Sequence, residues 1–282
     1  MRCIAPMATS SSIGALATGV CSPIMSAPHE WDAEAYQRLS DPQFAWGLRV
    51  LERLPLKGGE TVIDAGCGSG RLTGVLAQRL PRGHVIAVDR STNMVEEARR
   101  RLAELGDRVT FVCTDLTTFV SDVPVDAVFS TATFHWLHDH DRLFASIHRC
   151  LRSGGRLVAQ CGGAGNLERF HAHAERVCLD EPFAKWFVDF EPAWNFQGPD
   201  ATAARLQRAG FVDVACNLED APTPFADEPT FREFVRTVVL RHHLARLPYD
   251  ALRARYLDAV VARVAPSFEL DYVRLNLSAT RA

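Results

Sequence analysis

The sequence predicts an α/β fold, in which a largely parallel sheet carries helices on both of its faces. Short β-branched and apolar runs, typical of buried strands, alternate with stretches that have the apolar spacing of helices. A strand, a crossover helix and a second parallel strand form the repeating unit of such a fold. After a first helix at 44–54, the expected strands are 61–64, 84–88, 109–113, 127–130, 156–161, 211–218 and 268–278, and the expected helices between them are 71–80, 93–105, 142–151 and 201–208.

Two further helical patterns stand between the sixth and the seventh expected strand. Phe231, Val235 and Val239 share one helical face, and Leu252, Tyr256 and Val260 share another. We therefore expect a helical cap at about 228–265, inserted before the last strand of a single domain that spans 29–282.

Residues 1–28 differ in composition from the remainder of the chain. They are rich in Ser, Ala and Gly and contain a single basic residue, Arg2. A secretory signal needs a firmer apolar run and a transit peptide needs several arginines. We expect a disordered tail, or an upstream start codon with Met25 as the working initiator.

The composition argues against several classes of partner. The chain has 282 residues, with 31 basic against 34 acidic residues and a formal net charge of -3, whereas nucleic-acid binders carry a basic excess. It has no uninterrupted apolar run of roughly 18 residues that could span a membrane. None of its eight cysteines forms a C-x-x-C pair, which is typical of reduced thiols. We expect a cytoplasmic monomer or homodimer.

A glycine-rich turn follows the first expected strand and is the most informative stretch. It contains Gly66, Cys67, Gly68 and Gly70, and Asp64 precedes it. Such a turn brings backbone N–H groups close to a ligand. The third glycine of a dinucleotide site stands three positions after the second, but here it stands only two positions after it. The carboxylate of Asp64 would repel a pyrophosphate and attract a sulfonium or ammonium group, so the turn favours S-adenosylmethionine over a nicotinamide dinucleotide.

Two more acidic residues end the next two strands. Asp89 can accept hydrogen bonds from both ribose hydroxyls, and Asp115 can accept one from an adenine amino group while Leu116 packs beside the ring. Thr131, at the end of the fourth strand, completes the candidate cofactor site. Each aspartate alone could equally be a helix N-cap, but together with the glycine turn they would line one crevice.

These motifs resemble those of class I S-adenosylmethionine-dependent methyltransferases over residues 61–163. A narrower likeness is to trans-aconitate 2-methyltransferases, and carboxyl methyltransferases related to them carry similar short motifs. It depends on Trp31 and Tyr36, on the stretch 134–140 and on the stretch 272–275. The resemblance implies a Rossmann-like, seven-stranded class I methyltransferase sheet and methyl transfer to a small molecule.

The acceptor side is expected to bind a small organic carboxylic acid, which needs no general base because it is ionised at neutral pH. His135 could be a base, a hydrogen-bond donor to the substrate or a wall of the pocket, and Tyr36 is a second catalytic candidate. Trp31 could cover the methyl donor, or it could anchor the first helix. Trp136 could contact the substrate, although packing beneath a helix is the simpler interpretation. Arg241 and Arg274 could hold carboxylates, and a solvated helix face is the simpler interpretation of Arg241.

The stretch 138–141 (His-Asp-His-Asp) resembles a metal cluster, but a helix begins there and an N-cap explains its aspartates, so we expect no metal. We therefore expect O-methylation of a small organic acid. The alternatives are base-assisted O- or N-methylation of another metabolite and a catalytically silent cofactor-binding module. A nicotinamide oxidoreductase is disfavoured by the glycine spacing. Nucleic-acid methylation is disfavoured because the fourth strand is followed by 130–134 (Ser-Thr-Ala-Thr-Phe) and not by Asn or Asp, Pro-Pro and an aromatic residue, as in amino-methylating enzymes. The Pro-Cys dipeptide that a cytosine C5 enzyme needs does not occur in the sequence.

Overall fold

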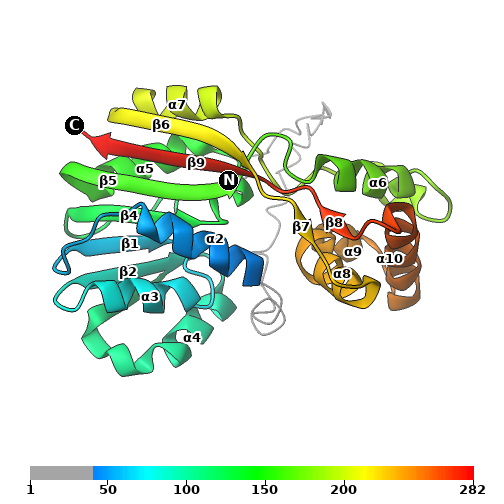
Figure 1. Ribbon diagram of the computed structural model, residues 1–282, viewed down its shortest axis with the longest axis horizontal. Helices are drawn as coiled ribbons and strands as arrows, with labels where there is room; N and C mark the ends of the chain where they lie inside the picture. Colours follow the sequence, from blue (N-terminus) through cyan, green and yellow to red (C-terminus); the bar gives the residue numbers. More distant parts are fainter. Residues whose placement is uncertain (1–40) are drawn as a thin grey trace, which may run out of the picture.

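A computed structural model describes residues 41–282, and its centre is a seven-stranded sheet with strand order β3-β2-β1-β4-β5-β9-β6 (Figure 1). The first five strands of this order run parallel, and β9 lies antiparallel between β5 and β6. The strands are β1 (Thr61–Ala65), β2 (His84–Asp89), β3 (Val109–Cys113), β4 (Val125–Thr131), β5 (Leu151–Gly162), β6 (Phe211–Asp220) and β9 (Val273–Arg281). The seven-stranded α/β class predicted from the sequence is confirmed.

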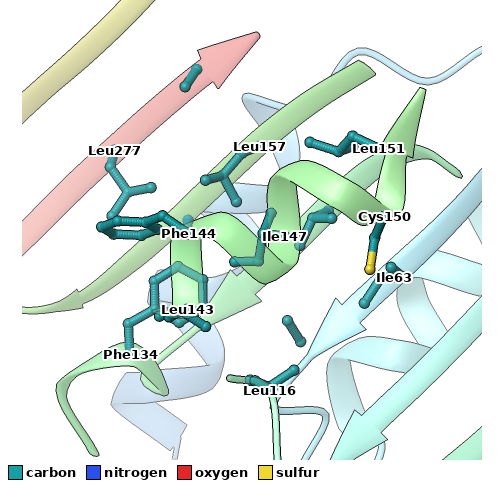
Figure 2. Close-up of a cluster of buried hydrophobic side chains, with 14 of the residues drawn as sticks. Ile63, Leu116, Phe134, Leu143, Phe144, Ile147, Cys150, Leu151, Leu157 and Leu277 are labelled. Carbon is teal, nitrogen blue, oxygen red and sulfur yellow. The ribbon is translucent and has the colours of Figure 1, made fainter. Parts of the chain in front are cut away.

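Helices cover both faces of the sheet because neighbouring residues of each strand point to opposite sides. On one face, α2 (Asp41–Glu52) and α3 (Arg71–Arg79) pack against the side of β1 that carries Val62. On the other face, α5 (His140–Cys150) and α7 (Pro199–Arg208) pack against the side that carries Ile63. Figure 2 shows Leu143, Phe144 and Ile147 of α5 close to Leu157 of β5 and Leu277 of β9.

The remaining elements of the sheet region are a further helix and two short turns. Helix α4 (Thr92–Arg101) contacts β2 and β3, and Ser91 caps it by accepting a hydrogen bond from Met94 N. The 3₁₀ segments η1 (Ala103–Arg108) and η2 (Phe134–Trp136) follow α4 and β4. None of the helices within residues 41–282 is both long and apolar enough to cross a membrane.

A second hydrophobic core forms the cap at the carboxyl ends of β1 to β5 (Figure 1). The expected stretch 228–265 forms α8 (Glu228–Phe234), the π-helical segment η4 (Val235–Val239), α9 (Arg241–Arg246) and α10 (Asp250–Val264). The cap also contains two elements that the sequence pattern does not predict, α6 (Glu168–Cys178) and η3 (Ala184–Trp186). Phe170 of α6 and Tyr256 of α10 are both fully buried in this shared core.

The last expected strand, 268–278, is two separate strands. Residues Glu269–Leu270 form β8, which pairs with β7 (Thr223–Pro224) beside the cap, and β9 starts only at Val273. Between them, Asp271 accepts hydrogen bonds from Arg169 N and Phe170 N at the start of α6. The interruption is therefore the point at which the chain anchors the cap helix before it enters the sheet. The tail 1–28, Trp31 and Tyr36 lie outside the described residues.

Candidate functional site

A cavity lies where the carboxyl ends of β1 to β4 meet the cap. The sheet side contributes the glycine turn, the ends of β2 and β4 and the segments that follow β3 and β4. The cap side contributes the loop before α6, α6 itself, the segment 194–196 and η4. The residues that line it are Gln43, Gly66, Gly68, Asp89, Arg90, Met94, Thr114, Leu116, Thr131, Ala132, Thr133, His135, Trp136, Leu137, Asn166, Leu167, His171, Trp194, Phe196, Val238, Val239, Tyr272 and Arg274.

The glycine turn is held against β2 by its own backbone. Gly66 N and Cys67 N both donate to Val88 O, at 2.7 and 3.0 Å. Gly66 has a φ of +86°, and a Cβ at this position would overlap the Thr133 side chain. The turn therefore requires glycine at position 66 for both conformation and space.

The predicted turn residues divide into two groups. Gly66 and Gly68 line the cavity, whereas Cys67 is buried in the sheet core and Gly70 begins α3. A Cβ on Gly70 would crowd Ala98 of α4 at 3.1 Å. Gly70 thus permits close packing between α3 and α4.

Asp89 is fixed at the end of β2 with its carboxylate at the cavity. Oδ2 accepts a hydrogen bond from Gly68 N and Oδ1 accepts one from Ser91 N, both at 2.9 Å. Burial raises the pKa of Asp89, while the two backbone N–H groups oppose this shift. Each carboxylate oxygen retains capacity for a further donor, which is the pattern needed to bind two hydroxyl groups.

Asp64 occupies a different place from the one that the sequence suggested. It is 2% exposed, is not among the residues that line the cavity, and accepts a hydrogen bond from Thr73 Oγ1 at 2.7 Å. Burial raises its pKa to about 7. Asp64 therefore ties β1 to α3 behind the glycine turn, and direct contact with a ligand in the cavity remains a prediction.

The third and fourth strands supply the next part of the wall. Leu116 and Thr131 line the cavity as expected. Asp115 is exposed and closes an Asx turn, in which Oδ1 accepts hydrogen bonds from Thr117 N and Thr117 Oγ1 at 2.7 Å. It stands between the lining residues Thr114 and Leu116 without lining the cavity itself.

His135 is 8% exposed and has one ring nitrogen already engaged. Gly162 N donates a hydrogen bond to His135 Nδ1 at 3.2 Å. Burial lowers the pKa of His135 well below its ordinary value, and the nearby Arg274 charge lowers it further, so the ring is neutral. A neutral imidazole has one lone pair and one N–H. Because Nδ1 uses the lone pair, Nε2 carries the proton and is a donor.

Arg274 and Trp136 both line the cavity, as predicted for substrate contacts, whereas Arg241 does not. Arg274 is 3% exposed, and its guanidinium lies over the rings of Trp46 and Tyr272, at 4.7 and 5.9 Å from their centroids. A buried cation beside a cavity favours an anionic ligand.

Most of the lining residues were not identified from the sequence, and among them Asn166, His171, Trp194 and Phe196 lie on the cap side. The spacing of Phe170, Ala174 and Val177 could have revealed α6, because these residues repeat at helical intervals and are buried. No comparable pattern marks Trp194 or Phe196, which stand in an irregular segment.

The stretch 138–141 forms the start of α5. Asp139 is the N-cap and accepts a hydrogen bond from Arg142 N, and His140 bonds to the carbonyl of Phe134. No group of three metal-binding side chains occurs within residues 41–282.

Comparisons with known proteins agree with this geometry. A methyltransferase domain model matches residues 62–155. The chain is 36% identical to a trans-aconitate 2-methyltransferase of Azoarcus sp., covering 84% of this chain and 90% of that protein. It is 35% identical to a trans-aconitate 2-methyltransferase of Methylobacterium nodulans, covering 89% of this chain and 98% of that protein.

Solved structures share the fold at lower sequence identity. Phosphoethanolamine N-methyltransferase 2 of Haemonchus contortus, in complex with S-adenosyl-L-methionine, has a TM-score of 0.56 and 22% identity over 88% of this chain and 56% of that chain. Geranyl diphosphate methyltransferase has a TM-score of 0.52 and 21% identity over 85% of this chain and 79% of that chain. The chain therefore belongs to the class I S-adenosylmethionine-dependent methyltransferases, and S-adenosylmethionine is its cofactor.

Proposed function

We propose that this enzyme transfers the methyl group of S-adenosylmethionine to a carboxylate oxygen of a small organic acid and releases a methyl ester. The relatives named trans-aconitate 2-methyltransferases support an acid as the acceptor. The single observation that carries the proposal is the state of His135, whose only lone pair is used by Gly162 N. The histidine beside the cavity can therefore donate a hydrogen bond to an anion but cannot remove a proton from an acceptor.

The sheet side of the cavity fits the cofactor. Asp89 presents a carboxylate whose orientation is fixed by two backbone donors, suitable for the ribose hydroxyls. Leu116 gives an apolar wall for the adenine ring, and Gly66 and Gly68 leave the turn without side chains. We propose that these residues and Thr131 hold the cofactor. When bound, the cofactor supplies a methyl group that is attached to a sulfonium sulfur. The sulfur is a leaving group that needs no activation by the protein.

The acceptor side carries hydrogen-bond donors suited to an anion. Arg274 contributes a buried cation and His135 contributes Nε2–H. Asn166 Oδ1 accepts from Val273 N at 3.0 Å, which leaves the Asn166 amide group as a donor. Asp89, at the cofactor end, is the only acidic residue among the described residues that line the cavity. The enzyme thus contributes binding and orientation of an ionised acid.

The step is balanced without a proton transfer. With the cofactor bound, the acceptor oxygen would form a bond to the methyl carbon as the carbon–sulfur bond breaks. The negative carboxylate would become a neutral ester, and the cofactor would leave with a neutral thioether in place of its sulfonium. The donors on the acceptor side hold the carboxylate in line for this displacement, and the aromatic residues Trp136, Trp194 and Phe196 exclude water from it.

The test is an assay of mono-, di- and tricarboxylic acids beside phenols and amines, with labelled cofactor. We expect base-labile methyl esters from acids. His135→Ala should reduce turnover by less than the roughly 10²–10⁴-fold loss that follows removal of a general base. Arg274→Met should raise KM more than it lowers kcat, because it removes binding of the acid. Arg241→Met, in the cap but outside the cavity lining, is the matched control.

Two results would overturn the proposal. Transfer only to phenols or amines, with His135→Ala inactive, would mean base-assisted methylation. Tight cofactor binding with no product from any acceptor would instead indicate a silent cofactor-binding module. Because the cap forms one wall of the cavity, we propose a small-molecule acceptor in preference to a nucleic acid.

A further inference from the structure

His171 of α6 is a buried polar side chain that the transfer step described above does not use. It is 7% exposed and lines the cap side of the cavity. Both of its ring nitrogens are buried, and neither has a hydrogen-bond partner among the residues that the structure describes. Buried polar atoms are nearly always bonded, and leaving one unbonded destabilises the folded state.

The ring is held in place by its faces. Trp194 stacks on it, with centroids 4.2 Å apart and an interplanar angle of 20°, and His243 lies 6.5 Å away in a near-parallel orientation. The backbone is also fixed, since His171 N donates to Leu167 O at 2.8 Å. The side chain is therefore oriented by aromatic packing, while neither of its ring nitrogens is hydrogen-bonded.

Two other buried histidines have at least one ring nitrogen bonded. His135 Nδ1 accepts from Gly162 N, and His140 Nε2 bonds to Phe134 O, whereas His140 Nδ1 has no partner and His140 does not line the cavity. His243 has an unbonded Nδ1, but it is not among the lining residues. Of these rings, His171 alone combines a place in the cavity wall with two unbonded nitrogens.

His171 and His135 share a neighbour in the cavity wall. The centroid of the Phe196 ring is 5.7 Å from that of the His135 ring and 6.4 Å from that of the His171 ring. Gly162 permits this position of Phe196, because a Cβ there would lie 2.6 Å from the Phe196 ring. An acceptor whose carboxylate reaches His135 and Arg274 would need a second polar group to reach His171.

We propose that His171 is a substrate-binding residue that hydrogen-bonds a second polar oxygen group of the acceptor, a hydroxyl or another carboxylate, remote from the oxygen that is methylated. This inference rests on the proposed function and extends it to the substrate class. The enzyme selects acids with a polar group at both ends over monocarboxylic acids of the same length. Burial lowers the pKa of His171 to about 4, so at neutral pH the ring offers one donor and one acceptor.

The experiment compares pairs of acids that differ only in the distal group, for example a dicarboxylic acid and the monocarboxylic acid with a methyl group in its place. kcat and KM are measured for the wild-type enzyme, His171→Phe and His171→Leu. Loss of this hydrogen bond should raise KM for the difunctional acid by roughly ten- to hundredfold, with a smaller change in kcat. KM for the monofunctional acid should change little, so the selectivity should largely disappear.

Two controls separate binding from structure. His243→Phe changes a buried histidine of the same aromatic cluster outside the cavity, and His173→Phe changes a half-buried residue of the same helix. Neither should alter the selectivity. Without acceptor, His171→Phe or His171→Leu should melt at the same temperature as the wild type or higher, because two unbonded polar atoms are removed.

The outcomes distinguish the two proposals. If the wild type forms esters and both His171 variants select between the two acids as strongly as the wild type does, the role of His171 is overturned and the proposed function stands. A fall in melting temperature in both variants, with KM rising equally for both acids, would show a structural role. Absence of ester from every acid would overturn the proposed function, and the inference with it.

Discussion

The buried carboxyl group of Asp64 makes the stability of this enzyme depend on pH in a direction opposite to that of most carboxylates. The side chain is 2% exposed and accepts a hydrogen bond from Thr73 Oγ1. Burial raises its pKa from the ordinary 3.8 to about 7, and the negative charge of Asp89 acts in the same direction. Between these two pH values the folded protein holds a proton that the unfolded chain has released.

The sign of the effect follows from proton linkage. The unfolded state binds fewer protons than the folded state in this interval, so the free energy of unfolding falls as pH rises. The contribution is complete below pH 3.8 and is lost as pH passes through about 7. Since one pKa unit corresponds to about 1.4 kcal/mol, the interval corresponds to about 4 kcal/mol at most.

Asp64→Asn tests this reasoning, because asparagine keeps an oxygen for the Thr73 hydroxyl and does not titrate. Urea unfolding is measured without cofactor at intervals from pH 5 to pH 8.5 for the wild type, for this variant and for the exposed control Asp122→Asn. The difference in free energy of unfolding between Asp64→Asn and wild type should shift in favour of the variant by about 2–3 kcal/mol across this range, because about two pKa units of the interval lie above pH 5. Parallel curves for all three proteins would refute the burial argument, whatever their absolute stabilities.

Two further predictions concern the cofactor side. Asp89→Ala should weaken S-adenosylhomocysteine binding by about a hundredfold or more in calorimetry, because two hydrogen bonds to a charged acceptor are lost. Asp115→Ala, at the exposed rim, should have a smaller effect. An unchanged affinity in Asp89→Ala would remove that residue from the site. Gly66→Ala should destabilise the protein by roughly 1–3 kcal/mol more than Gly68→Ala, because only the first Cβ overlaps the Thr133 side chain; equal melting temperatures would contradict this.

The sequence predicted the cofactor side in detail because its signals are local. A β-branched strand, a glycine turn and a helix start stand within one short stretch, and parallel strands bring their carboxyl ends to one edge. Gly66, Gly68, Asp89 and Leu116 accordingly line the cavity. The position of Asp64 could not be read in the same way. Successive strand residues alternate between faces, and only the placement of Thr73 on α3 shows which partner its carboxyl group meets.

The acceptor side was less predictable because it is assembled from distant segments. His135, His171 and Phe196 come from three different parts of the chain and meet only through the packing of the cap. Arg274 was predicted from a short stretch that resembles the family, and it lines the cavity. Arg241 was predicted because an arginine of the cap could hold a carboxylate, and it is not among the lining residues. Aromatic residues in an irregular segment carry no periodic signal, so Trp194 could be found only in three dimensions.

The last strand explains how a buried cation can be held in this cavity. Within β9, Arg274 pairs with Gly162 of β5 on one side and with Glu219 of β6 on the other, so its backbone is fixed between two neighbouring strands. Two residues later, Asn276 accepts hydrogen bonds from Arg53, which directly follows α2, and from Gln160 of β5, at 2.6 and 2.8 Å.

This network ties β9 to the segment that follows α2 and to a neighbouring strand. It lies on the same face as Arg274, because alternate strand residues share a face. The guanidinium is therefore placed over Trp46 and Tyr272 by rigid elements before any acceptor arrives. The free energy that keeps a cation in a largely aromatic wall comes from folding of the sheet. Preorganisation of this kind is what the proposed displacement without a base would require, since orientation would then be the main contribution that the protein makes to the rate.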